Sequence, residues 1–338
     1  MYILTKHLLY WEENMSFIEE QQLNYIQGTP LAINFFSVLS EPAHFHSQAY
    51  ELIYCLKGEI TIVSSESECT LYPGDFRGIN IDSVHYIKSN SDNLIASFHL
   101  NLTHPVIHTE NLEHTLFRIE PQQLKTIKEP EYKELHGFLL AVLYLYINDT
   151  KHHSDIYNSI CVYFVSNILK LFSLFNITND IRRPVWVQER FNDIILYLYT
   201  HYDEKLTLKK ISEMTHINYY YLSSHFNDIC GDTFNDYITV LRIFKSEKML
   251  LTTNASISSI VYACGFSSPK FYYAAFKSLY GMTPKEHRKR IAQHNEQSSP
   301  NKHFEVEEIS NTILHCLSYH YSKVQLDKVD SSILKGYL

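Results

Sequence analysis

The fold of this chain is decided by Ile211-Ser-Glu-Met-Thr-His-Ile-Asn-Tyr-Tyr-Tyr-Leu-Ser-Ser-His-Phe226, a pattern that returns as Ile260-Val-Tyr-Ala-Cys-Gly-Phe-Ser-Ser-Pro-Lys-Phe-Tyr-Tyr-Ala-Ala-Phe276. Each copy soon reaches a Gly-x-Thr sequence, at Gly231 and at Gly281. A short helix, a tight turn and a second helix form the helix-turn-helix motif, whose second helix enters the major groove of DNA. The repeat therefore predicts two such motifs and indicates a transcription regulator.

Apolar residues at helical spacing predict the local core of each copy. Such residues pack against neighbouring helices and carry little information about the DNA that is bound. The two sets are Ile211, Met214, Ile217, Leu222 and Phe226 in the first copy, and Ile260, Ala263, Phe266, Phe271 and Phe276 in the second.

The residues between these apolar positions are candidate DNA contacts on the second helix of each copy. Asn can bond adenine edges, Ser can bond bases or phosphates, and Tyr hydroxyls can bond phosphates. Any one of them could equally be a solvated residue on a helix face. The candidates are Asn218, Tyr219, Tyr220, Ser223, Ser224, Asn227, Ser267, Ser268, Lys270, Tyr273 and Lys277.

The composition is that of an ordinary globular protein. The 338 residues suffice for two domains with separate cores, and 45% of them are apolar and 20% charged. No apolar run approaches the roughly 20 residues that cross a bilayer, and the first residues do not resemble a signal peptide. The 6 cysteines are scattered without a C-x-x-C pair, as in a reduced compartment. We therefore expect a cytoplasmic protein with no membrane contact.

The net charge of −8 is unevenly distributed along the chain. Residues 186–292 carry 13 Lys and Arg against 10 Asp and Glu, a net charge of +3. Residues 1–185 have a net charge of −9, and residues 293–338 have one of −2. Attraction to phosphates must come from the segment that touches DNA. The modest excess predicts DNA binding with a shallow salt dependence.

Short strands are expected before residue 100. The segments 32–39, 50–56 and 59–63 are rich in β-branched and aromatic residues. Lys57-Gly58 reads as a tight hairpin between two of them, and 73–75 reads as another turn. This spacing favours a β-sandwich or a small barrel over a parallel sheet.

Helices are expected in the rest of the chain. Residues 132–147 and 156–175 predict an antiparallel helix pair, whose apolar excess could form a dimer interface or pack on the barrel. Residues 176–184 read as an inter-domain linker. After it, Thr207, Ser256 and Thr283 are expected helix caps. A last amphipathic stretch, 306–324, suggests no mechanism by itself.

Residues 186–292 resemble the DNA-binding domain of AraC/XylS-family transcription regulators. The resemblance implies two helix-turn-helix units joined by a long helix over 234–251, in which Arg242 is a structural ion-pair residue. It rests on Leu206-Thr-Leu208, Tyr221-Leu-Ser223, Leu241-Arg242-Ile243, Ala263-Cys-Gly-Phe266, Phe276-Lys277 and Tyr280-Gly-Met-Thr-Pro-Lys285.

The chain departs from this family at two recognition positions. Ser224 and Ala274 stand where members of the family often carry Arg. Losing those bidentate donors removes guanine contacts at these places. We therefore expect a binding site rich in A·T pairs, read partly through DNA shape.

Residues 31–100 resemble the cupin-like sensor domain of the same family. The matching sequences are Pro42-Ala-His44-Phe-His46, Glu51-Leu-Ile-Tyr54, Gly58-Glu-Ile, Leu71-Tyr-Pro-Gly-Asp75 and His85, although 80–85 lacks the usual Pro and Gly. In enzymatic cupins His44, His46, Glu51 and His85 would be metal ligands by order and approximate spacing, suited to Fe, Mn, Zn or Ni. They could instead be the polar wall of an effector pocket.

The expected effector set adds Tyr54 to these four residues. It belongs to a group of tyrosines suited to stacking on a sugar or another small polar ligand. That group is Tyr50, Tyr54, Tyr72 and Tyr86.

Together these features predict an α+β multidomain protein. A cupin-like β-barrel for effector binding (1–130) is followed by a helical dimerisation pair (131–183), an all-α double helix-turn-helix (186–292) and a C-terminal extension without an assigned role (293–338). The partners implied are double-stranded DNA, a small-molecule effector such as a sugar, RNA polymerase and a second copy of the chain. No cofactor is expected.

The expected function is ligand-controlled regulation of transcription, with activation favoured by family analogy. One alternative is a metal-dependent cupin enzyme with an accessory helical domain, and another is a regulator that acts through protein contacts. A glycine-rich phosphate loop, a G-x-S-x-G elbow and an H-E-x-x-H motif are missing from the sequence. We therefore do not expect an enzyme.

Overall fold

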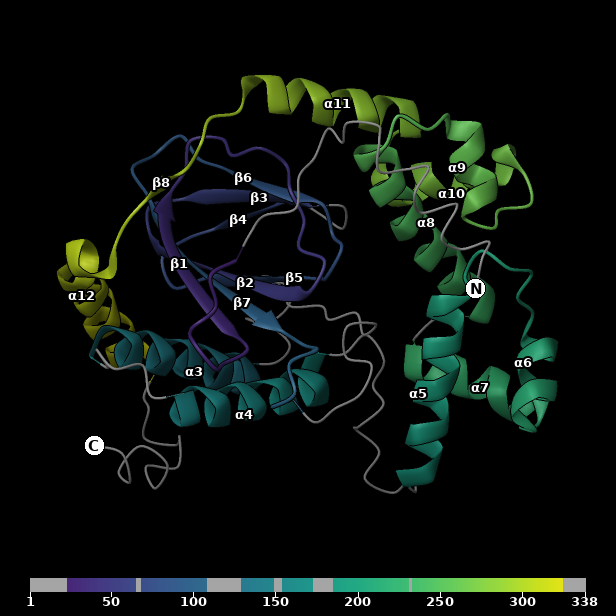
Figure 1. Cartoon of the computed structure of the whole chain (residues 1–338), viewed down its shortest axis with the longest axis horizontal. Coiled ribbons are helices and arrows are strands. Elements are labelled where there is room, and N and C mark those ends of the chain that lie inside the picture. The colour runs from purple at the N-terminus through teal and green to yellow at the C-terminus, as the bar shows by residue number, and fades with distance from the viewer. Residues whose placement is uncertain are drawn as a thin grey trace.

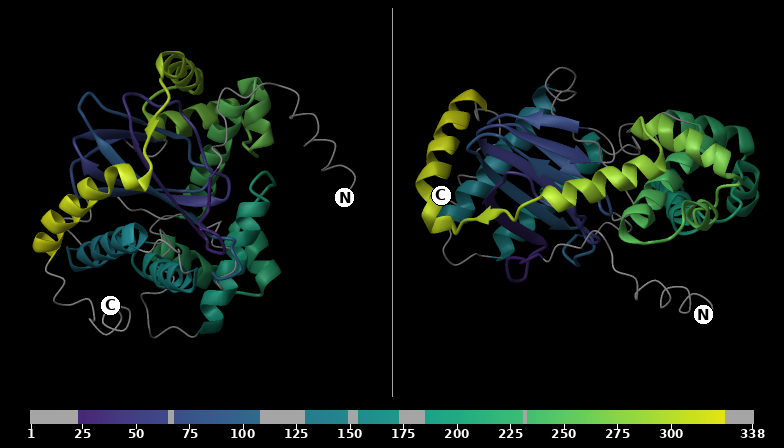
Figure 2. Two further views of the ribbon diagram at one scale, coloured as in Figure 1. Left: turned by 60° about the vertical axis from the view of Figure 1, so that its left-hand side comes forward. Right: turned by 90° about the horizontal axis from the view of Figure 1, so that it is seen from above.

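The computed structural model describes residues 23–64, 68–107, 129–148, 154–172, 185–230 and 233–324. A β-barrel with helices below it occupies one side of the molecule, and a group of helices occupies the other (Figure 1). Helix α11 (Pro284–Gln297) runs between the two parts, which the view from above shows most clearly (Figure 2). None of the described helices is long and apolar enough to span a membrane.

The barrel consists of two facing antiparallel sheets. The larger has the order β5 (Phe76–Ile79), β2 (Ala49–Lys57), β7 (Leu94–Asn101), β1 (Leu31–Ser37) and β8 (Lys302–His303). The smaller has the order β4 (Glu68–Leu71), β3 (Ile60–Ser64) and β6 (His85–Lys88). This arrangement confirms the predicted antiparallel barrel, and the strands follow the β-branched and aromatic segments of the sequence.

The predicted hairpin at Lys57-Gly58 is wrong in one respect. The chain does turn at Gly58, whose φ is 79°. However, β2 pairs with β5 and β7, whereas β3 pairs with β4 and β6, so the turn carries the chain from one sheet to the other. A Cβ at Gly58 would lie 2.2 Å from the carbonyl oxygen of Asp92, which is why only glycine fits this crossing.

The two faces of β2 enter different environments because side chains alternate along a strand. Tyr50, Leu52 and Tyr54 enter the core shared with the helices, whereas Ile53 and Cys55 enter the core between the two sheets. The helices that pack on the first of these cores are α3 (Glu129–Asn148) and α4 (Ser154–Phe172). Buried residues from both helices share that core with the strands. The structure thus shows that this helix pair packs on the barrel.

The C-terminal extension returns to the barrel. Its strand β8 pairs with β1, with Phe36 opposite His303. Its helix α12 (Val306–Val324) buries Ile309, Ile313 and Leu317 in the same core as α3 and α4. The amphipathic stretch 306–324 is therefore a packing helix, and the helical domain is followed by a segment anchored on the barrel.

Seven helices of the described chain form the C-terminal helical region. They are α5 (Val185–Thr200), α6 (Leu208–Thr215), α7 (Tyr219–Cys230), α8 (Phe234–Thr252), α9 (Ile257–Ala263), α10 (Pro269–Tyr280) and α11. One apolar core surrounds α6 and α7, a second surrounds α9 and α10, and α8 contributes to both. These are two helix-turn-helix units joined by one long helix, as the repeat predicts.

The predicted caps are confirmed. The side chains of Thr207, Ser256 and Thr283 each accept a backbone N–H of the following helix, and Thr283 forms a capping box with Glu286. Gly265 marks the turn of the second unit with a φ of 73° and lies against the backbone of Asp203. The predicted linker at 176–184 lies outside the described residues.

Three of the predicted core residues are wrong. Met214 is 44% exposed and Phe271 is 50% exposed, and Ala263 is also exposed. Helical spacing fixes only which residues share a face; the neighbours that cover the face come from other segments. Phe271 stands on the outward side of α10, where the next residue, Tyr272, takes the buried place.

Candidate functional site

The second helix of each motif exposes an aromatic surface. On α7 it consists of Tyr219, Tyr220 and Tyr221, and Tyr220 is the most open at 80%. On α10 it includes Phe271 and Tyr273. Tyr221 and Phe271 occupy equivalent positions of the repeat and are equally exposed. The two helices thus offer matched outward faces that can contact a groove.

Several of the other predicted DNA-contact residues are exposed too, but the side chains of two of them cap the N-termini of α7 and α10. Ser224, Ser267, Lys270 and Lys277 are exposed, and Ser223 is half-buried. The Asn218 side chain accepts the backbone N–H groups of Tyr220 and Tyr221, and Ser268 caps α10. The side chain of Asn227 lies outside the described residues. Asn218 and Ser268 therefore fix the starts of the recognition helices.

Arg242 has a structural role, although it forms no ion pair with another residue that the structure describes. Its guanidinium donates to the carbonyl oxygens of Tyr202 and Glu204, both at 2.7 Å. In the second unit, Arg288 donates in the same way to the carbonyls of Leu250 and Ala255. Planar guanidinium groups suit such paired contacts. Arg242 thus holds the segment after α5 against α8, and Arg288 holds the end of α8 and the segment after it against α11, so both arginines serve the fold.

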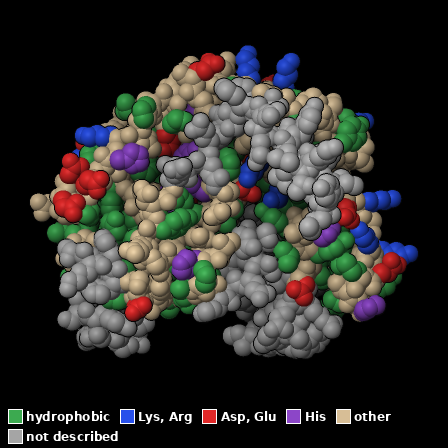
Figure 3. All heavy atoms as spheres, viewed as in Figure 1, with side chains coloured by type: hydrophobic (Ala, Val, Ile, Leu, Met, Phe, Trp, Pro, Cys, Tyr) green, Lys and Arg blue, Asp and Glu red, His purple; other side chains and the backbone are tan. Residues whose placement is uncertain are grey.

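The sequence predicts an excess of positive charge over residues 186–292 and of negative charge over the rest of the chain. In the view of Figure 3, Lys and Arg project along the top and the right-hand edge, over α11 and the neighbouring helices. Asp and Glu gather on the left, where α12 carries Glu307 and Glu308. On this face of the molecule, more of the basic side chains lie over the part that bears the two motifs than over the barrel.

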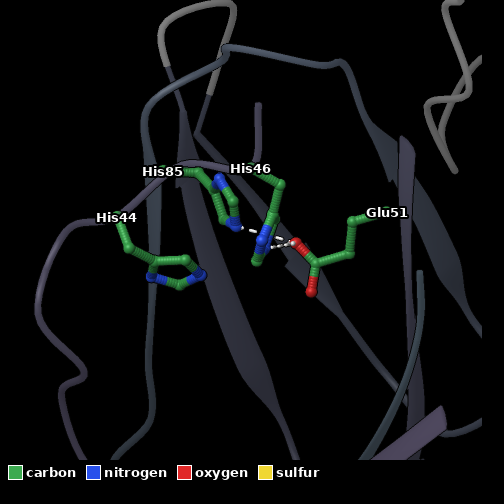
Figure 4. Close-up of side chains that lie close together, drawn as sticks. All are labelled: His44, His46, Glu51 and His85. Atoms are coloured by element: carbon green, nitrogen blue, oxygen red, sulfur yellow. Dashed lines mark ion pairs between the residues drawn. The ribbon is translucent and has the colours of Figure 1, made fainter. Parts of the chain in front are cut away.

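The cupin-like part brings four predicted residues together inside the barrel. Ligand atoms of His44, His46, Glu51 and His85 all lie within 4.8 Å of one another (Figure 4). The Glu51 carboxylate lies 2.8 Å from His85 Nε2 and 3.3 Å from His46 Nε2. His46, Glu51 and His85 are buried and His44 is half-buried. We call these four residues the His/Glu cluster.

A fifth residue, His99, was missed by the sequence argument. Its Nε2 lies 3.2 Å from the other carboxylate oxygen of Glu51. The reason is the register of the sheet, in which Glu51 on β2 stands opposite His99 on β7. The only sequence signal for His99 was a histidine in a predicted strand. Such a signal does not show which other strand pairs with it, and so it does not place His99 next to Glu51.

The tautomers of two cluster histidines are set by the backbone. His85 Nδ1 lies 3.0 Å from the carbonyl oxygen of Ser83, and His44 Nδ1 lies 3.1 Å from that of Pro42. A carbonyl only accepts, so Nδ1 carries the proton of the neutral ring and Nε2 is left as a lone pair. His85 Nε2 and Glu51 Oε2 are buried without a hydrogen bond of good geometry, despite their short separation.

The cluster is strongly coupled electrostatically. Burial opposes the charge on Glu51, but His99 and His85 outweigh it and hold the pKa of Glu51 well below its usual value. Burial, together with His85 and His46, lowers the pKa of His44 well below its usual value. Burial also lowers the pKa of His46, whereas Glu51 overcomes the burial of His85 and raises its pKa. A carboxylate therefore stands among imidazoles of which His44 and His46 are neutral at neutral pH.

This donor set fits a metal ion. Neutral imidazole nitrogens and one carboxylate are the ligands that Zn, Fe, Mn and Ni take in proteins. The Nδ1–carbonyl contacts of His44 and His85 are the outer contacts that orient ligating histidines. The buried Nε2 and carboxylate atoms without hydrogen-bond partners are what a cation would satisfy. A metal held by His44, His46, Glu51 and His85 would supply a fixed positive charge that ties these segments together.

Tyr54 does not join the predicted effector set. It lies on the opposite face of β2 from Glu51, fully buried in the helix core, where its hydroxyl lies 2.6 Å from His136 Nε2. The alternation of side chains on a strand puts residues three apart on opposite faces. Of the other tyrosines, Tyr50 shares that core, Tyr72 is exposed and Tyr86 stacks on His294.

Two protein families match this chain. A helix-turn-helix domain matches residues 211–290, and a cupin domain matches residues 38–101. These segments coincide with the double helix-turn-helix and with the barrel that holds the His/Glu cluster. The two matches lie in the order that the sequence predicts.

Three curated relatives show the kind of protein that the chain resembles. The HTH-type transcriptional regulator YisR of Bacillus subtilis is 29% identical over 35% of this chain and 39% of its own length. The melibiose operon regulatory protein of Escherichia coli is 31% identical over 31% of this chain and 34% of its own length. The probable transcriptional regulator LumQ of Photobacterium leiognathi is 22% identical over 73% of this chain and 92% of its own length.

The matched segment thus covers about two fifths of YisR and a third of the melibiose protein. The helix-turn-helix match, residues 211–290, contains both copies of the repeat. The chain thus contains a cupin domain and a helix-turn-helix domain, in the order of the AraC/XylS-family transcription regulators that its sequence resembles.

Proposed function

We propose that the protein is a transcription regulator that binds double-stranded DNA through α7 and α10. The observation that carries this proposal is the pair of matched aromatic surfaces, in which Tyr221 and Phe271 take equivalent places. Both helices pack on α8, so one rigid element sets the distance between them. Two recognition helices on one connector suit successive turns of the major groove.

The proposal assigns effector binding to residues 1–130 and DNA binding to 186–292. The His/Glu cluster, with His99, is the effector site, and its donors favour a metal ion over a sugar. The melibiose and xylose operon regulatory proteins are named for sugars, so a sugar remains the rival ligand for this domain. Tyr54 has no place in this site because it lies on the other face of β2.

Dimerisation through residues 131–183 is part of the proposal. Tyr144 on α3 and Val162 and Tyr163 on α4 are exposed, although the opposite sides of both helices are buried on the barrel. Exposed apolar residues on neighbouring helices suit a contact with a second copy. A dimer that contacts RNA polymerase would act as an activator, the sign favoured for this family.

A gel shift with the DNA upstream of the gene tests the proposal. We expect binding by the full chain at low salt, and a loss of about 5- to 150-fold in affinity for Tyr220→Ala, because a groove contact contributes about 1–3 kcal/mol. Tyr319→Ala is the matched control, since Tyr319 is also exposed but lies on α12.

The outcome also separates the proposed regulator from its rivals. No shift at low salt would overturn DNA binding and would favour the regulator that acts through protein contacts. A metal-dependent cupin enzyme would contain stoichiometric metal without specific DNA binding. Metal content alone therefore does not distinguish the regulator from the enzyme, whereas the gel shift does.

A further inference from the structure

The two segments that supply the histidines of the cluster have a second, apolar face. His44 and His46 alternate with Ala43 and Phe45, and His85 stands between Val84 and Tyr86. The backbones of His44 and His85 are joined by a reciprocal pair of hydrogen bonds of 2.9 and 3.0 Å. Alternation along an extended chain sends neighbouring side chains to opposite sides. The histidines point into the barrel and their neighbours point away from it.

The apolar face is the docking surface of the DNA-binding part. Ala43, Phe45, Val63, Val84 and Tyr86 form one buried cluster with Leu251 of α8 and Ile291 of α11. We call this set the docking cluster. His294 of α11 stacks on the Tyr86 ring with 3.6 Å between the ring centroids. Each of the two histidine segments therefore contacts both the ligand site and the helical domain.

Polar contacts follow the same route. The backbone N–H of Asp82 donates to the carbonyl oxygen of His46, and the Asp82 carboxylate pairs with Lys248 and Lys245 of α8. Lys248 Nζ also lies 4.6 Å from the centroid of the ring of Phe45, the residue between the two histidines. Asp82 has a φ of 64°, so its backbone is held in a conformation that few residues adopt. Helix α8 thus contacts both histidine segments.

A second helix makes the same kind of contact. The Asn295 side chain of α11 accepts the backbone N–H of Ala43 at 2.9 Å, and His294 Nε2 lies 2.8 Å from the carbonyl oxygen of Glu41. Helices α8 and α11 belong to the double helix-turn-helix, and α8 joins its two recognition units. In Figure 2, α11 leads from these helices to the barrel. A change in the histidine segments would therefore act directly on α8, the helix that sets the spacing of the recognition helices.

We propose that a divalent transition-metal ion in the His/Glu cluster strengthens the docking of α8 and α11 on the barrel. A shared metal would fix residues 44–46 against residue 85, and the apolar faces of these segments would then be held in the arrangement that α8 and α11 contact. Because coupling between sites is reciprocal, the factor by which the metal strengthens docking is also the factor by which docking strengthens metal binding, so a variant that weakens docking should bind the metal more weakly. This inference deepens the proposed function, since it names the effector class and the route of its signal.

Zinc binding by the full chain, measured with hydrogen exchange, tests this inference. Zn²⁺ is titrated against a competing chelator, and amide exchange is followed in peptides of α8 and α12. We expect one Zn²⁺ per chain and exchange in α8 that slows by about 5-fold or more. Helix α12 packs in the separate core of α3 and α4 and reports any general stabilisation.

A variant outside the His/Glu cluster tests the coupling between metal binding and docking without changing the metal ligands. Asp82→Asn leaves every cluster ligand in place, and we expect it to bind Zn²⁺ several-fold more weakly and to lose most of the added protection in α8. Asp92→Asn is the matched control, because Asp92 forms an exposed ion pair with Lys57 on another turn of the barrel. We expect it to behave as the wild-type chain does. His46→Ala with His85→Ala should abolish stoichiometric binding.

Each outcome decides one part of the inference. Stoichiometric Zn²⁺ without extra protection in α8 would overturn the coupling, and so would equal effects of Asp82→Asn and Asp92→Asn. The metal site would be overturned if the wild-type chain bound Zn²⁺ no more tightly than the double histidine variant does. The same holds if it bound no more Zn²⁺ than it does in excess chelator. DNA binding is read separately in the gel shift, so a failure here leaves the proposed DNA-binding function to its own test.

Discussion

The double helix-turn-helix and the barrel place their candidate functional residues in opposite settings. On α7 and α10 the candidates are exposed, and Tyr220 is open over most of its surface. In the barrel His46, Glu51 and His85 are buried and converge on one another. Water screens and replaces contacts at an exposed site, whereas a buried polar group depends on its protein partners. Substitutions should therefore change binding in the first region and both binding and stability in the second.

The largest effect is expected at Glu51. Glu51→Gln removes the negative charge that faces three histidines, and breaking a buried ion pair costs about 3–5 kcal/mol of unfolding free energy. Urea unfolding at pH 7 with chelator present measures this loss. Glu68→Gln is the control, because the Glu68–Lys88 pair is exposed and should matter little. Equal stability of the two variants would show that the buried setting of Glu51 is unimportant.

A similar size of effect is expected for Glu41 as a function of pH. Burial raises the pKa of Glu41 to about 7, against the opposing hydrogen bond from Asn301 and the charge of His85, with Glu51 adding to the rise. A raised folded pKa gives stability that is full below the unfolded pKa and lost as pH rises through the folded one. Between about pH 4.5 and 7 this amounts to about 3 kcal/mol. Glu41→Gln should remove that slope, which melting curves at several pH values measure.

Helix α12 allows the comparison of buried and exposed residues within one element. Ile313 is fully buried on the barrel, whereas its neighbour Leu314 is 40% exposed. Ile313→Ala should cost about 2–4 kcal/mol of unfolding free energy, and Leu314→Ala less than about 1 kcal/mol. Chemical unfolding of both variants measures the difference. If neither changed stability, the return of the C-terminal segment to the barrel would not contribute to the fold.

The smallest effect is expected on the recognition surface. Ala274→Arg places a bidentate donor on the exposed face of α10, so a guanine at the facing base pair should gain about 1–3 kcal/mol in binding. Wild-type protein should prefer A·T pairs there. Selection of bound sequences from a random pool compares the two preferences. Ser318→Arg is the control, because it adds the same charge at an exposed position of α12. An unchanged preference in Ala274→Arg would contradict the assignment of this face to a groove contact.

Much of the fold could be predicted because its signals are local. The caps at Thr207, Ser256 and Thr283 depend on residues a few places apart, and the repeat indicates two motifs and the helix between them. Met214 and Phe271 were misplaced because burial depends on which segment covers a helix face. Local chemistry thus predicts where the helices begin and end better than it predicts which other segments pack against them.

The candidate site was predicted only in part for the same reason. His44, His46, Glu51 and His85 follow a spaced motif and do meet, whereas His99 joins them through the pairing of β2 with β7. Tyr54 was placed in the site although strand alternation turns it to the other face. Pairing register and sheet order are long-range properties, and one sequence specifies them weakly.

The sequence by itself determined the two domains, the paired motifs and four of the cluster residues, because spacing along a strand or helix fixes which side chains share a face. Only the tertiary structure decided that α12 returns to the barrel and that α8 and α11 dock on the backs of the histidine segments. Those contacts join residues far apart in the chain, such as Ala43 and Asn295. Contacts of that range arise from the packing of whole elements, which no local pattern in the chain records.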